Sequence, residues 1–273
     1  MEFSKYHGLG NDFILIDNRH RSELLISPDR VRSLCDRHFG IGADGIIFLL
    51  QDQNQNYQMR IINSDGSEPE MCGNGIRCLA RFMADQGIEP TGGQYRIGTL
   101  AGEMVLHLKE ELITVDMGLP RLLAGEIPTT LVDKDQTVIN QTLKVDEEAW
   151  RVTCVSMGNP HCVTFTDRVD GLDLAKMGAK FEHHPLFPRR TNVEFVEVID
   201  RSHVKVRVWE RGAGATLACG TGACAVVVAG VLNDLTDRVC RVDLPGGSLQ
   251  IEWAERVFMT GTADRVFKGQ IEF

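Results

Sequence analysis

Two cysteines of this sequence stand in the same short motif. Cys72 opens Cys-Gly-Asn-Gly and Cys219 opens Cys-Gly-Thr-Gly, and an apolar segment directly follows each motif. This arrangement predicts a helix whose N-terminus carries roughly +0.5 of a charge and several unpaired N–H groups. Such an end favours a thiolate over a thiol, and glycines leave the backbone N–H groups open to a carboxylate. We therefore expect two reactive thiols, each at the start of a helix.

The two motifs belong to a longer internal repeat, because they lie 147 residues apart and other matches share this offset. The same offset relates Arg60 to Arg207, Asn63 to Glu210, and Phe48 to Phe195. Asn11 and Asn159, each preceded by glycine, correspond at an offset of 148. Ordered matches of this kind indicate two copies of one supersecondary plan. Since similar halves commonly enclose a cleft, we expect both cysteines to approach it from opposite sides.

Two thiols on opposite faces of one carbon suit a two-base racemase or epimerase. One thiolate would remove the α-proton, and the opposite thiol would deliver a proton to the other face. General acid–base catalysis contributes roughly 10²–10⁴-fold, so donors fixed on the substrate carboxylate must supply the rest. The chain therefore needs no cofactor, neither pyridoxal phosphate nor metal, for this chemistry. The spacings Cys72-x5-Cys78 and Cys219-x4-Cys224 also fit structural zinc poorly.

Composition excludes several classes of partner. The 29 basic and 38 acidic residues give a net charge of −9, and no basic run compensates locally, so nucleic acid and anionic membrane surfaces are poor partners. The N-terminus lacks the basic start and apolar stretch of a signal peptide. We expect a cytoplasmic protein whose eight cysteines are mostly thiols.

The remaining sequence predicts a mixed α/β protein with many short, mainly antiparallel strands and no regular βαβ alternation. Ser27-Pro28-Asp29 is a helix start, and we expect that helix to end at Gly40. The apolar segment 223–232 reads as a buried helix. A domain junction is expected near residue 118. Strands are expected at 13–16, 45–50, 58–62, 95–100, 104–108, 112–117, 150–156, 162–165, 192–199 and 203–209.

At these residues the sequence resembles the diaminopimelate epimerase family, and the matching stretches span nearly the whole chain. They begin at His7, Asn63, Cys72, Ser156, Glu210, Cys219 and Leu244. The resemblance implies an α/β fold of the α+β type with two pseudo-symmetric domains. Each would be a curled, mostly antiparallel, barrel-like sheet around a central helix. The first domain would comprise residues 1–118 and 264–273, and the second 119–263.

The resemblance also implies an activity and a set of site residues. The family's cofactor-independent enzymes interconvert LL- and meso-diaminopimelate in lysine and peptidoglycan precursor biosynthesis, and a homodimer is expected. Cys72 and Cys219 would be the acid and base, and His161 and Glu210 would tune their protonation. Substrate would be bound by Asn11, Asn63, Gly73, Asn74, Asn159, Asn192, Glu210, Arg211, Gly220 and Thr221. Gly45 stands where some family members carry a glutamine that contacts substrate, so no contact is expected there.

Two other interpretations remain open. The first is another amino-acid racemase, such as a proline racemase, or an acid isomerase on the same plan. Arg211 and the asparagine set favour a substrate charged at both ends. The second is a thiol-redox or metal-binding protein, which the absence of any Cys-x2-Cys pair disfavours.

Overall fold

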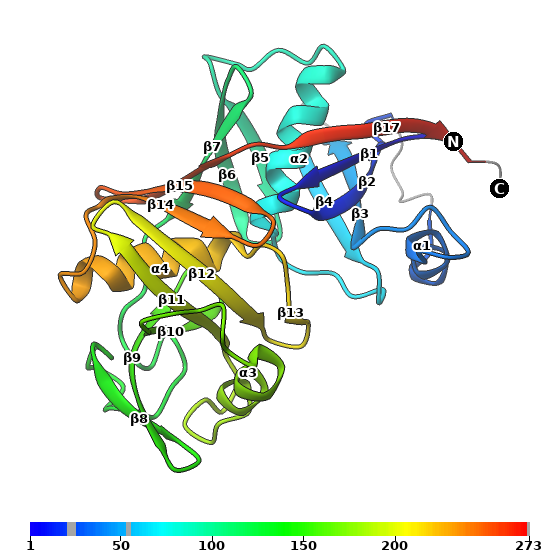
Figure 1. The fold of residues 1–273 in the computed structure, drawn as a ribbon. Coiled ribbons are helices and arrows are strands. Elements are labelled where there is room, and N and C mark those ends of the chain that lie inside the picture. Colours follow the sequence, from blue (N-terminus) through cyan, green and yellow to red (C-terminus); the bar gives the residue numbers. More distant parts are fainter. Residues whose placement is uncertain (21–25, 53–55, 272–273) are drawn as a thin grey trace. The chain divides into compact units, whose positions relative to one another are not determined.

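The computed structural model describes residues 1–20, 26–52 and 56–271 (Figure 1). The chain divides into two compact units, residues 1–116 with 260–273 and residues 117–259. Residues 272 and 273, which the sequence analysis assigns to the first domain, lie outside the described part. None of the helices in the described ranges has the length and apolar character to cross a bilayer.

The first unit is a sheet with two helices. Neighbouring strands run in the order β17, β1, β2, β3, β4, β5, β6 and β7; β2–β3 and β4–β5 are parallel and the other pairs antiparallel. The strands are β1 (Glu2–Gly8), β2 (Asn11–Asp17), β3 (Gly45–Gln51), β4 (Tyr57–Asn63), β5 (Tyr95–Thr99), β6 (Gly102–Lys109), β7 (Leu112–Gly118) and β17 (Asp264–Gln270). The helices are α1 (Pro28–Cys35) and α2 (Gly73–Asp85).

The second unit repeats this plan. Its strands run in the order β8, β9, β10, β11, β12, β14 and β15, with β10–β11 and β12–β14 parallel, and β13 pairs with β12. The strands are β8 (Gln141–Val145), β9 (Glu148–Ser156), β10 (Pro160–Phe165), β11 (Asn192–Asp200), β12 (His203–Glu210), β13 (Gly214–Ala215), β14 (Val239–Leu244), β15 (Gly247–Trp253) and β16 (Val257–Gly261). The helices are α3 (Leu174–Glu182) and α4 (Gly220–Leu232).

Strand pairing confirms the internal repeat. Strands β1 to β5 have the same alternation of antiparallel and parallel neighbours as β9, β10, β11, β12 and β14. The registers also correspond, because Phe13 lies opposite Gly45 and His161 lies opposite Asn192. Each half therefore places equivalent sequence positions at equivalent points of its sheet.

A central helix packs against the sheet of each unit. Helix α2 contacts β1, β2, β3, β4, β6 and β17, and α4 contacts β9, β10, β11, β14 and β15. Residues 222–230 of α4 are all buried, as expected for a helix that is apolar on every side. The expected mixed α/β class, with mostly antiparallel strands around a central helix, is confirmed.

The first helix ends earlier than the sequence predicts. Ser27 is its N-cap and Pro28 its first residue, as expected, but α1 ends at Cys35 and not at Gly40. The carboxylate of Asp36 accepts hydrogen bonds from the backbone N–H groups of His38 and Phe39 at 2.8 and 2.7 Å. This local turn competes with further helical bonds, which is why the helix stops at an aspartate.

Candidate active site

Cys72 and Cys219 are the N-cap residues of α2 and α4. Their backbone angles are nearly the same, with φ −135° and ψ 119° at Cys72 and φ −121° and ψ 109° at Cys219. Each sulfur accepts a hydrogen bond from the backbone N–H of the glycine three residues later, at 3.4 Å from Gly75 and 3.3 Å from Gly222. Both sulfurs therefore lie at the positive end of a helix dipole, where negative charge is stabilised.

In the first half, Asn11 is the polar neighbour of Cys72. The Cys72 thiol donates to the side-chain oxygen of Asn11 at 3.7 Å, and the amide nitrogen of Asn74 donates to the same oxygen at 3.2 Å. The amide nitrogen of Asn11 donates to the Asp44 carboxylate at 2.7 Å. Asp44 thus fixes which end of the Asn11 amide faces the sulfur.

Asp44, the partner of Asn11, belongs to a cluster of charged side chains. Arg37 bridges Asp12 and Asp44 at 2.7 and 2.9 Å, and Lys5 also pairs with Asp12. Burial acts to raise the pKa of Asp12, but the hydrogen bonds from Arg37 and Lys5 outweigh it and lower the pKa to about 2. Asp12 is therefore ionised at neutral pH and holds the two cations in place.

Arg77 is a buried cation in the first turns of α2 that the sequence analysis does not assign to the site. Its side chain is fully buried and donates to the Gly73 carbonyl at 3.2 Å, the Asn74 side-chain oxygen at 3.0 Å and the Thr262 carbonyl at 3.3 Å. It orients Asn74, which in turn contacts Asn11. An arginine placed directly between two apolar residues, Ile76 and Cys78, is the signal that could have revealed it.

In the second half, Cys219 has ionisable neighbours. Its sulfur lies 3.5 Å from the Thr221 hydroxyl, and the cysteine residue is 5% exposed. Burial, followed by the nearby charges of Glu210 and Glu194, raises the pKa of Cys219 well above that of an ordinary thiol. This is the opposite of the shift expected from the helix start, because burial outweighs the hydrogen bond from the Gly222 backbone N–H. Burial also raises the pKa of Glu210, although the Thr216 hydroxyl donates to its carboxylate at 2.5 Å and opposes the shift.

His161 is fully buried beside this cysteine. Its Nδ1 lies 2.7 Å from a Glu194 oxygen and its Nε2 lies 3.0 Å from the side-chain oxygen of Asn159. Glu194, on β11, is also fully buried and is absent from the residues expected from sequence. A single acid within the apolar start of that strand is the signal that identifies it.

Asn192 and Arg211 are joined to each other rather than to a cysteine. The Asn192 side chain is 3% exposed; its nitrogen donates to the Pro160 carbonyl at 2.7 Å and its oxygen accepts from the Arg211 backbone N–H at 2.9 Å. The Arg211 guanidinium donates to the Arg189 carbonyl at 3.1 Å. Asn192 therefore positions the chain at Arg211, and each end of its amide already makes one hydrogen bond.

Asn63 and Gly45 lie opposite one another where β4 ends and β3 begins. The Asn63 side chain donates to the Ser67 hydroxyl at 3.1 Å, and among the described residues no hydrogen bond joins it to Cys72. A Cβ at Gly45 would lie 2.8 Å from the Ile62 carbonyl oxygen. A larger residue there would require the backbone to move, which accounts for glycine at this position.

His161, Glu194 and Cys219 offer potential ligand atoms that lie within 4.8 Å of one another. Three such donors could hold a metal ion. Both ring nitrogens of His161, however, already face oxygen atoms of Glu194 and Asn159. The same three side chains also suit proton transfer, with the Cys219 sulfur as the atom that gains and loses the proton.

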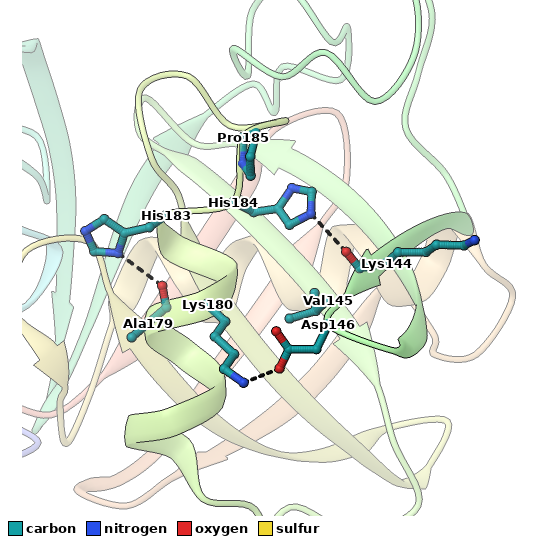
Figure 2. Close-up of a pocket in the computed structure, with 8 residues that line it drawn as sticks. All are labelled: Lys144, Val145, Asp146, Ala179, Lys180, His183, His184 and Pro185. Carbon is teal, nitrogen blue, oxygen red and sulfur yellow. Dashed lines mark hydrogen bonds and ion pairs between the residues drawn. The ribbon is translucent and has the colours of Figure 1, made fainter.

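A surface pocket between β8 and α3 contains none of the expected site residues. Figure 2 shows its lining, in which Lys180 pairs with Asp146 and the His184 ring bonds the Lys144 carbonyl at 2.9 Å. Lys180 and Asp146 are therefore already paired with each other. We therefore keep the two N-cap cysteines, each within its own unit, as the candidate site residues, and not the lining of this pocket.

Comparison with known proteins identifies the family of this chain. The family model described as diaminopimelate epimerase matches residues 3–123 and 153–266, which is most of the chain. The chain belongs to the diaminopimelate epimerase family. Diaminopimelate epimerase 1 of Nostoc sp. (strain PCC 7120) is 61% identical over 99% of each chain. Diaminopimelate epimerase of Gloeothece citriformis (strain PCC 7424) is 61% identical over 100% of this chain and 99% of its own.

Solved structures extend the fold beyond diaminopimelate epimerases. A PhzF-family phenazine biosynthesis protein of Bacillus anthracis superposes with a TM-score of 0.69 at 14% identity, covering 100% of this chain and 99% of its own. A probable proline racemase of Agrobacterium radiobacter gives 0.68 at 13% identity, covering 99% and 92%. At these identities the likeness concerns the fold alone.

Proposed function

We propose that this chain interconverts LL- and meso-diaminopimelate by a two-base mechanism in which Cys72 and Cys219 are the acid and the base. The observation that carries this proposal is the pair of cysteines in matching N-cap geometry at the two central helices. Membership of the diaminopimelate epimerase family supports the substrate. The reaction belongs to lysine and peptidoglycan precursor biosynthesis.

The proposed chemistry starts with one cysteine as thiolate and the other as thiol. The thiolate takes the α-proton of the substrate, and the thiol gives a proton to the opposite face of the same carbon. Negative charge that develops on the α-carboxylate is stabilised by backbone N–H groups at the helix starts, at Gly73, Asn74, Gly220 and Thr221. After inversion the protonation states of the two sulfurs are exchanged.

The other predicted residues recognise the remaining polar groups of the substrate. Arg211 can bind a carboxylate in bidentate fashion, and Glu210 can bind an ammonium group. Asn11, Asn63 and Asn159 supply neutral donors and acceptors. Asn192 contributes by holding the Arg211 backbone. His161 and Glu210 tune the protonation of the Cys219 half-site.

The resemblance to the family also leads us to expect a cytoplasmic homodimer. Light scattering of the purified chain tests the assembly, because a dimer gives twice the mass of one chain. A monomeric mass at working concentration would contradict this expectation without bearing on the reaction.

The test of the mechanism is the origin of the new α-proton. In heavy water without added cofactor, a two-base enzyme produces inverted product that carries deuterium from the first turnovers, while unconverted substrate starts nearly unlabelled. Cys72→Ala and Cys219→Ala should each abolish epimerisation in both directions. A surviving thiol can still exchange the α-proton slowly on its own face.

Cys78 and Cys224 provide matched controls, because each lies in the same helix as one of the proposed catalytic cysteines and is fully buried. Alanine at either control position should leave inversion and deuterium incorporation intact. Near-normal epimerisation by Cys72→Ala or Cys219→Ala would remove the two-base assignment. Inversion of proline but not of diaminopimelate would favour the alternative racemase.

A further inference from the structure

Glu194 is a buried acid for which the proposed reaction gives no role. Its side chain is fully buried on β11, and Oε1 lies 2.7 Å from His161 Nδ1. Oε2 has no hydrogen-bond partner in the described part of the chain. A carboxylate in such surroundings is costly unless a positive charge compensates it. A carboxylate at this buried position therefore needs a specific partner, and His161 is the residue in contact with it.

Both ring nitrogens of His161 face oxygen atoms. A neutral imidazole carries one N–H, whereas an imidazolium carries two. Nδ1 faces the Glu194 carboxylate and Nε2 faces the side-chain oxygen of Asn159 at 3.0 Å. A doubly protonated ring satisfies both oxygens and pairs its charge with Glu194. The other ionisable groups near the ring are Glu210 and Cys219.

The bond to His161 also determines how Asn159 is turned. Because its oxygen accepts from the ring, its amide nitrogen is the end left to donate to another group. Asn11, the equivalent residue of the first half, is turned the other way: its nitrogen donates to Asp44 at 2.7 Å and its oxygen faces Cys72. The two halves thus present opposite ends of equivalent amides.

The equivalent positions of the first half do not hold an acid and a histidine. Ile47 corresponds to Glu194 at the offset of 147, and Phe13 corresponds to His161 at 148. Ile47 and Glu194 also occupy the same place, since a Cβ at Gly75 would lie 2.9 Å from Ile47 Cδ1 and one at Gly222 would lie 2.7 Å from Glu194 Oε1. At this position the first half has an apolar side chain and the second half a carboxyl group.

We propose that Glu194 is a positioning residue of the Cys219 half-site. It holds His161 with both ring nitrogens protonated, and His161 turns Asn159 so that its amide nitrogen donates to a carboxylate oxygen of the substrate. The effect on substrate rests on the proposed epimerase function. The protonation of His161 does not depend on that function and can be measured separately.

The direct test is nitrogen NMR of histidine labelled with ¹⁵N, near neutral pH. His161, assigned by the loss of its signals in His161→Gln, should show two protonated nitrogens in the unmodified chain. Glu194→Gln keeps the size of the side chain but removes its charge, and should convert the ring to the form with one unprotonated nitrogen. An unprotonated nitrogen on His161 in the unmodified chain would overturn the proposal without any Glu194 variant.

Kinetics test the proposed effect of Glu194 on substrate binding through Asn159. Glu194→Gln should raise KM for diaminopimelate roughly tenfold, the effect of one misdirected hydrogen bond, and change kcat less. Glu197→Gln is the matched control, because Glu197 lies on the same strand and its carboxylate accepts from the Val169 backbone N–H at 3.1 Å. Equal KM values for the two variants would overturn the role of Asn159. If the unmodified chain does not invert diaminopimelate, the proposed function fails while the NMR result still decides the protonation of His161.

Discussion

The side-chain oxygen of Asn192 accepts a hydrogen bond from the backbone N–H of Arg211 at 2.9 Å. The amide nitrogen of Asn192 donates to the Pro160 carbonyl at 2.7 Å, so one buried side chain ties together the starts of β10 and β11 and the residue after β12. Arg211 is the proposed contact for a substrate carboxylate. Asn192 is therefore placed to act on substrate through the backbone of its neighbour.

Asn192→Ala should raise KM with a smaller change in kcat, because the Arg211 backbone loses its anchor while the thiols remain in place. The variant should also lose about 1–3 kcal/mol of stability, since the buried Pro160 carbonyl and the part-buried Arg211 N–H lose their partner. Asn233→Ala is the control: its amide donates to the Thr153 hydroxyl and the Ala229 carbonyl at 2.9 and 2.7 Å. It should lose similar stability in urea unfolding and keep its KM.

The raised pKa of Cys219 predicts slow alkylation at neutral pH. Since only the thiolate reacts, labelling of Cys219 by iodoacetamide should accelerate at a pH above that of an ordinary thiol. Glu210→Gln removes a nearby negative charge, which lowers the pKa and moves the acceleration to lower pH. Peptide mass spectrometry at a series of pH values measures both profiles. Glu252→Gln, a change at an exposed residue of β15, should leave the Cys219 profile where it is.

The ion pairs of Asp12 predict a loss of stability in acid. Its pKa is about 2 in the folded chain and near 3.9 when unfolded, so its contribution is fully present above pH 4 and disappears as the pH falls through 2. Asp12→Asn should therefore be less stable by about 2 kcal/mol at pH 7, and the difference should shrink by pH 3. Urea unfolding at pH 7, 4 and 3 measures it. The exposed variant Asp135→Asn should show no comparable difference; a gap that persists unchanged at pH 3 would refute the linkage.

Sequence patterns anticipated the features that depend on neighbouring residues in the chain. The glycine motifs predicted that Cys72 and Cys219 open helices, and the offset of 147 predicted that the strand pairing repeats. Both are properties of local conformation and periodicity, and both are confirmed. The prediction that α1 ends at Gly40 is wrong because the Asp36 side chain forms a turn with the His38 and Phe39 backbone before that glycine is reached.

Sequence patterns could not predict contacts between residues that lie far apart in the chain and meet only in the tertiary structure. Asp44 lies 33 residues from Asn11, and Glu194 lies 33 residues from His161. Each pair meets only because two parallel strands, β2 with β3 or β10 with β11, bring their starting ends together. An isolated acid in an apolar strand signals that such a partner exists without identifying it. The roles of the individual site residues remain predictions for the experiments above.

The repeat also supplies a matched pair of glycine variants, which tests whether the Glu194 carboxylate is held rigidly. In Gly75→Ala the new methyl group would lie 2.9 Å from Ile47 Cδ1, the end of a flexible side chain that can rotate away. Alanine also favours the helix by up to about 1 kcal/mol, so stability should change little. In Gly222→Ala the methyl group would lie 2.7 Å from Glu194 Oε1 and 3.2 Å from the Cys219 sulfur.

Relief of that second contact requires the carboxylate to leave His161, so Gly222→Ala should cost about 1–3 kcal/mol. It should also lower kcat/KM more than Gly75→Ala does, because the displaced groups belong to the Cys219 half-site. Urea unfolding and kinetics in both directions of the reaction compare the two variants. Equal costs at the two glycines would mean that Glu194 yields as easily as Ile47, and that the acid does not hold His161 in one orientation.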